Sequence, residues 1–157
     1  MDQTGSRYHD PMAERGTYTY DYPRPMVTVD LVILRETADG PEVLLIRRGK
    51  PPFEGLLALP GGFVEMDEDL PDAAARELAE ETGLTGIALT QLGAFGKPGR
   101  DPRGRNIAVA FVGSAPSDAR AIAGDDAADA FWLPAKGIRQ LAFDHAAILA
   151  LALARHR

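Results

Sequence analysis

An acidic segment constrains this chain more than any other feature of its sequence. Between Gly62 and Leu84 the chain carries one cationic side chain, Arg76, and eight carboxylates. These are Glu65, Asp67, Glu68, Asp69, Asp72, Glu77, Glu80 and Glu81. Two like charges about 4 Å apart at a protein surface repel by roughly 4 kcal/mol, so solvent must separate these acids or a cation must lie between them. The kind of site therefore depends on whether the acids scatter or converge.

The second half of this segment is predicted to be a helix over residues 70–82. It is rich in Ala, Leu and Glu, and Gly83 suits the left-handed position that ends a helix. At roughly 100° per residue, three of its acids fall on one arc beside the buried stripe. These acids are Glu77, Glu80 and Glu81. Carboxylates with this spacing suit Mg²⁺ or Mn²⁺, so the arc predicts a divalent-cation site, with a solvated acidic face as the alternative.

The remaining pattern predicts strands before and after this helix, and a second helix at the end of the chain. The predicted strands span residues 17–25, 26–36, 41–49, 86–97, 106–114 and 128–134. The second and third of them are separated by turn residues and are expected to form a hairpin. The final helix is expected to begin near Asp144, which suits an N-cap. This order indicates an α/β fold with a mixed sheet covered on both faces.

Composition narrows the class of protein further. With 157 residues, 45% of them hydrophobic, we expect one domain over residues 17–157 after a mobile N-terminal arm at residues 1–16. The net charge of −6 argues against nucleic-acid binding, and the absence of cysteine excludes disulfides and thiolate catalysis. The arm has no apolar segment typical of a secretory signal, and the longest apolar run, residues 146–154, is far short of the ~20 residues that span a bilayer. A cytoplasmic protein without a membrane partner is the expectation.

The acidic segment resembles the signature box of the Nudix hydrolases. That box consists of Gly, five residues, Glu, seven residues, and then Arg-Glu-apolar-any-Glu-Glu-any-Gly-apolar. Its specified positions are filled without a gap by Gly62, Glu68, Arg76, Glu77, Leu78, Glu80, Glu81, Gly83 and Leu84. The resemblance implies a Nudix-type α/β/α sandwich with a mixed sheet. It also implies cleavage of a nucleoside diphosphate linked to a further group.

The resemblance assigns roles within the box. The metal ligands would be the main-chain carbonyl of Gly61 and the side chains of Glu77, Glu80 and Glu81. The metal would be Mg²⁺, with Mn²⁺ as an alternative, and Glu68 would pair with Arg76 to hold the loop against the helix. Metal ions would bridge the carboxylates to pyrophosphate oxygens and neutralise the charge that develops on cleavage.

The substrate's remaining charge calls for basic side chains, and these occur on both sides of the box. They are Arg47, Arg48, Lys50, Lys97, Arg100, Arg103 and Arg105. Arg48 and Arg103 are our candidates for substrate binding, with a solvated surface charge as the alternative for each. Arg103 lies in a loop between strands, where binding residues often sit. For Arg47, Lys50 and Lys97 we prefer the solvated charge.

Aromatic and polar residues outside the box are weaker candidates. Phe53 is a candidate to stack on adenine, with simple packing beside two prolines as the alternative. Trp132, in a strand-like segment, is expected in the core. Asp144 and His145 are expected to cap and pack the last helix.

The general base is left open by the sequence. Many Nudix hydrolases carry a further glutamate well after the box, but this chain has no glutamate beyond Glu81. Asp125 and Asp126 lie in a loop-like segment where one of them could replace it, and a solvated turn is the alternative. In that case the base would come from the box itself, as Glu80 or Glu81.

The wider sequence is most similar to the small ADP-ribose pyrophosphatases. The matching segments are residues 24–34, 51–65, 99–105 and 141–149. This similarity implies hydrolysis of ADP-ribose to AMP and ribose 5-phosphate, and often a homodimer. The alternatives are hydrolysis of a nucleoside triphosphate or of another nucleoside diphosphate sugar, and a non-catalytic ADP-ribose sensor, which the intact box disfavours.

Overall fold

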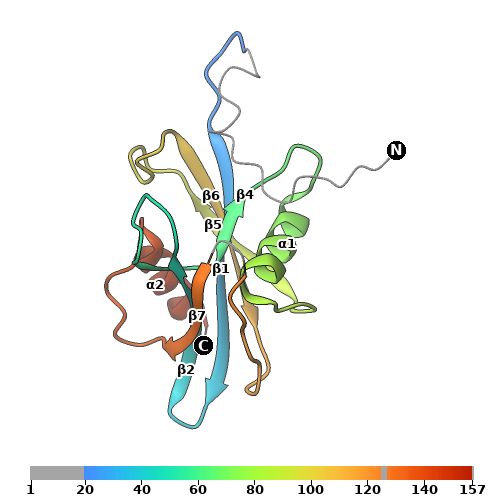
Figure 1. The fold of residues 1–157 in the computed structure, drawn as a ribbon, viewed down its shortest axis with the longest axis vertical. Helices are drawn as coiled ribbons and strands as arrows, with labels where there is room; N and C mark the ends of the chain where they lie inside the picture. Colours follow the sequence, from blue (N-terminus) through green and yellow to red (C-terminus); the bar gives the residue numbers. More distant parts are fainter. Residues whose placement is uncertain (1–19, 125–126, 157) are drawn as a thin grey trace.

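The computed structural model describes residues 20–124 and 127–156. Within these residues a mixed sheet lies between two helices, α1 (Leu70–Thr82) and α2 (His145–Arg155), which cover opposite faces (Figure 1). The predicted α/β/α sandwich with a mixed sheet is therefore confirmed.

The sheet is organised around β1, its longest strand. The described strands are β1 (Met26–Thr37), β2 (Gly40–Arg48), β3 (Leu57–Ala58), β4 (Gly61–Phe63), β5 (Leu89–Phe95), β6 (Asn106–Ser114) and β7 (Ala127–Pro134). The order is β3-β2-β1-β6-β5, while β4 pairs with β1 and β7 pairs with β2. In this sheet β1 and β6 run parallel, and the other described pairings are antiparallel. The predicted hairpin is present, with Thr37 opposite Gly40.

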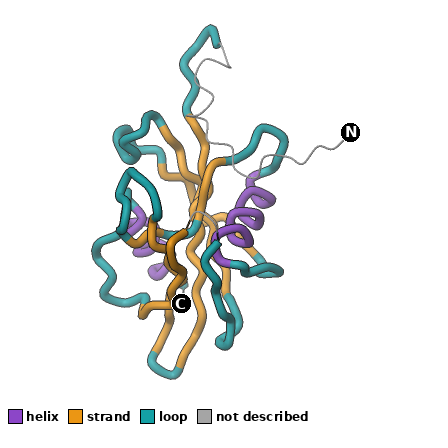
Figure 2. Tube along the Cα trace, viewed as in Figure 1, coloured by secondary structure: helices purple, strands orange, loops and turns teal. Residues whose placement is uncertain are grey.

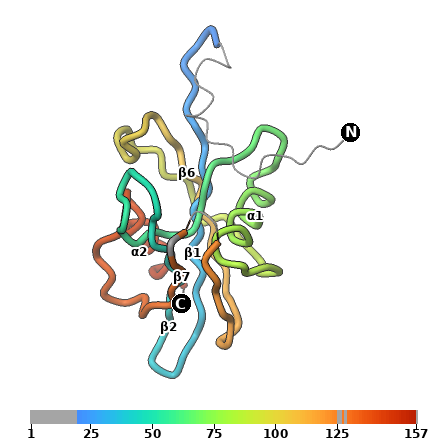
Figure 3. Tube along the Cα trace, viewed as in Figure 1, coloured from blue at the N-terminus to red at the C-terminus, as the bar shows by residue number. Residues whose placement is uncertain are grey.

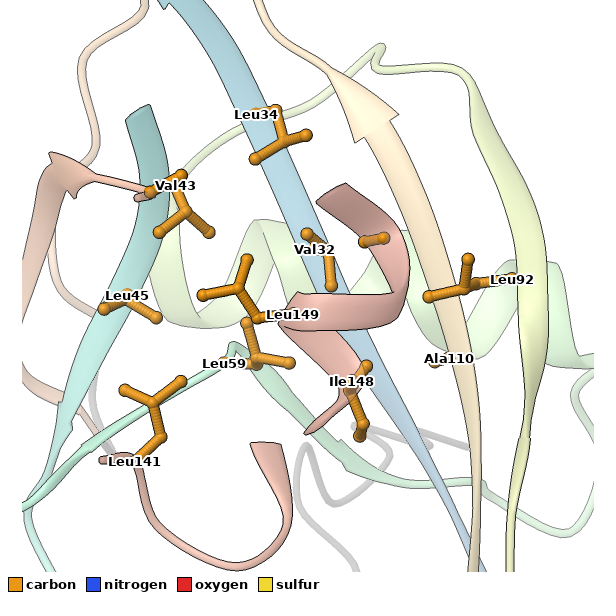
Figure 4. Packing of buried hydrophobic residues seen from close by; sticks show 12 residues of the cluster. Val32, Leu34, Val43, Leu45, Leu59, Leu92, Ala110, Leu141, Ile148 and Leu149 are labelled. Carbon is orange, nitrogen blue, oxygen red and sulfur yellow. The ribbon is translucent and has the colours of Figure 1, made fainter. Parts of the chain in front are cut away.

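Side chains of β1 alternate between two hydrophobic cores, because successive residues of a strand point to opposite faces. Val32 and Leu34 pack in the core under α2, beside Ile148 and Leu149 (Figure 4). Leu31 packs in the core under α1, and so do Val29 and Ile33, two positions before and after it. A strand buried on both faces tends to have a continuous apolar sequence, as residues 31–34 do.

The strand β1 changes partners along its length, and this fork positions the functional site. Residues 34–37 pair with β2, whereas residues 28–30 pair with β4. Three connecting loops, residues 49–56, 96–105 and 135–144, lie on the same side of the sheet as α2 (Figures 2 and 3). Residues of both branches and of these loops line one cavity.

Helix α1 matches its predicted limits. Asp69 is the N-cap and accepts a 2.7 Å hydrogen bond from the backbone N–H of Leu70, and a proline occupies the first turn, where its missing N–H costs little. Gly83 ends the helix in the left-handed conformation, at φ 71°. These two caps define the ends of the helix that carries the acidic arc.

Helix α2 begins next to Asp144, as expected, but the predicted capping role of this side chain is wrong. Asp144 makes no side-chain cap hydrogen bond. Its carboxylate instead accepts from Arg100, with a distance of 2.9 Å from Nε to Oδ2. A charge-assisted hydrogen bond from a guanidinium is stronger than a hydrogen bond from a neutral backbone N–H. The carboxylate of Asp144 therefore pairs with Arg100 and does not cap the helix.

Other expectations fail or stay untested. Residues 20–25 form no strand, so the strand predicted over residues 17–25 is wrong in its described part. Residues 17–19 and the predicted arm, residues 1–16, lie outside the described residues. The short strands β3 and β4 were not predicted, because two or three residues are too few to show alternation. No helix in the described ranges is long and apolar enough to cross a membrane.

Candidate catalytic site

Arg76 connects the acids of the box. Its Nε donates to Oε2 of Glu68 at 2.9 Å, and its Nη1 donates to Oε1 of Glu77 at 2.7 Å and to Oε2 of Glu80 at 3.3 Å. Nη2 also donates to the carbonyl oxygen of Phe63, at the end of β4, at 3.0 Å. One guanidinium thus ties α1 to the loop before it, and Glu68 and Arg76 lie together as the sequence predicted.

Glu77 is a buried carboxylate, with only 2% of the residue exposed. Burial raises the pKa of Glu77 to about 7, although the hydrogen bond and charge of Arg76 oppose the shift. The carboxylate packs directly on Gly62: a Cβ at that position would lie 2.3 Å from Oε1 of Glu77. The first glycine of the box therefore leaves the space that this carboxylate occupies.

Glu81 is linked to the first residue of β4. Its Oε2 accepts a 2.9 Å hydrogen bond from the backbone N–H of Gly61. Gly61 in turn lies against β1, where a Cβ would come within 2.1 Å of the carbonyl oxygen of Val29. Two of the predicted metal ligands, Gly61 and Glu81, are thereby brought to the wall of the same cavity.

The donor groups on α1 suit a divalent cation, because Mg²⁺ and Mn²⁺ prefer carboxylate oxygens. Glu77 and Glu80 already share one positive group, Nη1 of Arg76, whereas Glu81 accepts from Gly61. Across residues 20–124 and 127–156, no three acidic or histidine side chains are gathered into a ready-made metal site. The residues therefore fit Mg²⁺ or Mn²⁺ by ligand type, and the three glutamates do not converge on one point.

A cavity of about 480 Å³ extends from the box to the loops on the α2 side of the sheet. Gly61 and the box residues Gly62, Phe63 and Glu81 contribute to its wall. Four cationic residues line the same cavity, Arg48, Lys50, Arg100 and Arg103. A ligand in this space would meet both carboxylates and guanidinium groups.

Arg103, a predicted substrate-binding residue, is held by Asp101. Its Nε lies 3.0 Å from Oδ1 and its Nη2 lies 2.7 Å from Oδ2 of this buried carboxylate. The guanidinium also lies over the ring of Phe63, with Cζ 4.8 Å from the centroid. Burial alone would raise the pKa of Asp101, but the hydrogen bonds from Arg103 and Asn106 lower it below its usual value.

Arg48 and Phe53, the other predicted binding residues, both contact the ring of Phe143. Nε of Arg48 donates to the carbonyl oxygen of Pro52 at 2.6 Å, and its Cζ lies 4.9 Å from the ring centroid of Phe143. Phe53 is 39% exposed and contacts Phe143 edge to face, with 4.9 Å between centroids. Phe53 does not line the cavity, so the structure places it at the outer side of Phe143.

The other predicted surface cations lie mostly away from the cavity. Arg47 lies near Asp129 at 3.9 Å and Arg105 donates to the carbonyl of Gly96. Lys97 is exposed, as expected, whereas Lys50 lines the cavity. Trp132 is half-buried and packs against the core under α1, in line with the prediction.

A buried ionic network that includes three residues of the cavity wall, Asp30, Arg100 and His145, was missed by sequence reasoning. Arg100 pairs with Asp144 and also lies 3.4 Å from Oδ2 of Asp30, and Nε2 of His145 lies 3.5 Å from Oδ1 of Asp30. Burial would raise the pKa of Asp30, but His145 and Arg100 outweigh it and lower the pKa. A charged residue inside the apolar run of residues 26–34 was the signal that could have revealed this network.

The comparisons with known proteins agree with this geometry. The family model described as the NUDIX domain matches residues 24–152. The chain belongs to the Nudix family.

Relatives within the Nudix family include both enzymes and a regulator. The chain is 41% identical over 128 residues to an ADP-ribose pyrophosphatase of Methanocaldococcus jannaschii, covering 82% of this chain and 73% of that protein. It is 40% identical over 93 residues to the ADPR responsive transcriptional repressor NtrR of Acinetobacter baylyi, covering 58% of this chain. The matched part is only 37% of that repressor's length.

Two solved structures are similar over most of the chain. The NUDIX domain of Shewanella oneidensis NrtR, complexed with ADP ribose, has a TM-score of 0.81 at 30% identity, covering 95% of this chain and all of that one. A bifunctional NMN adenylyltransferase/ADP ribose pyrophosphatase from Francisella tularensis, complexed with AMP and a Mn ion, has a TM-score of 0.73 at 29% identity. That match covers 87% of this chain and 43% of the other.

The candidate bases Asp125 and Asp126 lie outside the described residues. Gly124, the described residue before them, is packed against the end of the Nudix box: its N–H donates to the carbonyl oxygen of Glu81 at 3.0 Å. A Cβ on Gly124 would lie 1.6 Å from the carbonyl oxygen of Glu80. The chain that leads to the two aspartates is therefore anchored on the helix that carries the glutamates.

Proposed function

We propose that this Nudix protein is a pyrophosphohydrolase that hydrolyses ADP-ribose to AMP and ribose 5-phosphate with the help of Mg²⁺ or Mn²⁺. The observation that carries this proposal is the composition of one cavity wall: Glu81 of the box and Gly61, just before the box, line the same space as Arg48 and Arg103. An anionic pyrophosphate would be repelled by carboxylates alone. The combination of acids and guanidinium groups is what a charged diphosphate with a bound cation requires.

The acidic and the basic residues have different roles in this proposal. Glu77, Glu80 and Glu81 would hold the divalent cation, which when bound neutralises phosphate charge and makes water a competent nucleophile near neutral pH. Arg48 and Arg103 would bind the phosphate oxygens through charge-assisted hydrogen bonds. Water then adds to one phosphorus as its P–O bond to the bridging oxygen breaks, and the bridging oxygen leaves with the other phosphate.

Two groups of residues remain candidates for the general base. Glu81 lines the cavity, which supports a base within the box, whereas Glu80 does not line it and contacts Arg76. Asp125 and Asp126 follow a segment anchored at Glu81, which supports a base from the loop. The base would accept the proton that the attacking water loses.

A substrate panel tests the proposal. The purified chain would be incubated with ADP-ribose, a nucleoside diphosphate hexose and a nucleoside triphosphate, each with Mg²⁺, with Mn²⁺ or with EDTA. We expect the highest kcat/KM for ADP-ribose, equal amounts of AMP and ribose 5-phosphate, and no turnover in EDTA. A higher kcat/KM for another substrate would make that substrate class the function instead.

The similarity to an ADPR responsive repressor supports a second candidate, an ADP-ribose sensor. Calorimetry with ADP-ribose, followed by chromatography of the same sample, separates the two. Tight binding with ADP-ribose recovered intact after incubation with Mg²⁺ would establish the sensor. We favour the enzyme because every specified position of the Nudix box is filled.

A homodimer is also proposed from the family resemblance, and light scattering of the purified chain would test it.

A further inference from the structure

Two arginines from distant parts of the chain lie over one aromatic ring. Cζ of Arg48, at the end of β2, is 4.9 Å from the ring centroid of Phe143, and Cζ of Arg103 is 5.4 Å from the same centroid. All three residues line the cavity described above. The two predicted substrate-binding cations are thus brought together at a residue that the sequence did not single out.

The backbone of Phe143 is held in an unusual conformation. Its φ of 54° lies in the left-handed region, which a bulky side chain rarely adopts. Both neighbours are anchored: the N–H of Ala142 donates to the carbonyl oxygen of Leu57 at 2.8 Å, and Asp144 is paired with Arg100. Such strain persists where surrounding contacts determine it, and it is concentrated at functional sites.

The contact of each guanidinium with the ring of Phe143 uses none of its N–H donors. A guanidinium over an aromatic face is attracted by the ring itself, while its N–H groups point along the plane of the guanidinium. Nε and Nη2 of Arg103 donate to Asp101, and within the described residues no acceptor is bonded to its Nη1. The ring therefore limits the movement of two flexible cations without using their donors.

We propose that Phe143 is a positioning residue that holds Arg48 and Arg103 ready for the diphosphate group of the substrate. This inference rests on the proposed function, because it assumes that the cavity binds a nucleoside diphosphate derivative. Two guanidinium groups fixed at one ring suit two linked phosphates better than a single phosphate. Preorganised cations bind their anion with a smaller loss of side-chain entropy, so the ring acts on affinity rather than on the chemical step.

Simple packing is the competing explanation, because Phe143 also packs on the small core cluster that contains Ile46 and Ala142. A matched control separates the two. Phe131 on β7 carries a guanidinium at a similar distance, with Cζ of Arg47 5.3 Å from its ring centroid, and neither residue lines the cavity. Phe131→Leu therefore removes the same kind of contact outside the site.

The experiment compares Phe143→Leu, Phe143→Tyr and Phe131→Leu with the unmodified chain, by steady-state kinetics and by calorimetric binding of ADP-ribose. We expect Phe143→Leu to raise KM and Kd for ADP-ribose about tenfold with little change in kcat, as expected for lost cation–π contacts. Phe143→Tyr keeps an aromatic face and should restore wild-type KM. Phe131→Leu should leave KM unchanged.

If Phe143→Leu does not fold, Phe143→Gly takes its place in the comparison, since glycine adopts a φ of 54° without strain. Wild-type KM and Kd in these variants, or an equal rise in Phe131→Leu, would overturn the inference while leaving the proposed function intact. If the unmodified chain neither binds nor hydrolyses ADP-ribose or another nucleoside diphosphate derivative, both the proposed function and the inference fail. Non-additivity supplies a second check: Arg103→Ala should raise KM less in the Phe143→Leu background than alone.

Discussion

Gly62 and Glu77 approach so closely that a Cβ on the glycine would lie 2.3 Å from Oε1 of the buried carboxylate. A Gly62→Ala variant must therefore displace Glu77 or the backbone of β4, and overpacking of this kind costs about 1–3 kcal/mol. We expect a lower melting temperature together with a large loss of kcat/KM. Gly93→Ala is the control, because a Cβ there meets nothing within 4 Å. Equal effects of the two substitutions would argue against a specific role for the Gly62–Glu77 contact.

Neutral replacements test the metal ligands on α1. Glu77→Gln and Glu81→Gln keep the shape of the side chain and remove the charge, so we expect folded proteins that lose at least ~100-fold in turnover. Titration of activity with Mg²⁺ should show a weaker apparent affinity for the metal. Asp72→Asn, on the exposed face of the same helix, should behave like wild type. Near-full activity of both glutamine variants at limiting Mg²⁺ would remove the metal-site assignment.

Arg76 is expected to serve stability and activity together. Its guanidinium contacts Glu68, Glu77 and Glu80, and Glu77 is buried. Arg76→Ala leaves these carboxylates uncompensated, and we expect the free energy of unfolding to fall by about 2–3 kcal/mol, with reduced kcat/KM. Chemical denaturation measures the first quantity. The exposed Arg139→Ala is the control, and unchanged stability in Arg76→Ala would show that the acids are solvated.

The base can be located kinetically. If an aspartate accepts the proton from water, its asparagine variant should lower kcat with little change in KM. We expect Asp126→Asn to show a larger loss than Asp125→Asn. Asp129→Asn, at an exposed position on β7, is the control. Wild-type kcat in both Asp125→Asn and Asp126→Asn would return the role to Glu80 or Glu81.

Asp101 is expected to make the free energy of unfolding fall at acid pH. Because its pKa in the folded protein is lowered from 3.8, the folded state binds the proton less well than the unfolded state. The stability that Asp101 contributes is therefore fully present above the unfolded pKa and is lost as the pH falls through the lower pKa of the folded state. Asp101→Asn should be less stable than wild type at neutral pH, and the difference should shrink as the pH falls below 3.8. Urea denaturation over this pH range measures the difference, with Asp39→Asn at an exposed position as the control substitution.

Local signals were sufficient for α1 and for the box that it carries. Asp69 and Gly83 mark the ends of the helix, and the spacing of its glutamates follows from helix geometry, so a single segment of sequence contains the information. The strand predicted over residues 17–25 failed in its described part for the opposite reason. Alternating residues form a strand only when another strand pairs with them, and residues 20–25 form no such pair.

The sequence by itself determined the helix, the acidic arc, the hairpin and the Nudix resemblance, because each depends on residues that are close in the chain. Only the tertiary structure decided which cations face the acids. Arg48 and Arg103 both contact Phe143, and Arg100 is buried in a pair with Asp144. These contacts form because β2, the loop after β5 and the segment before α2 converge on one side of the sheet. Long-range contacts of this kind are set by strand order and packing, which no local pattern records.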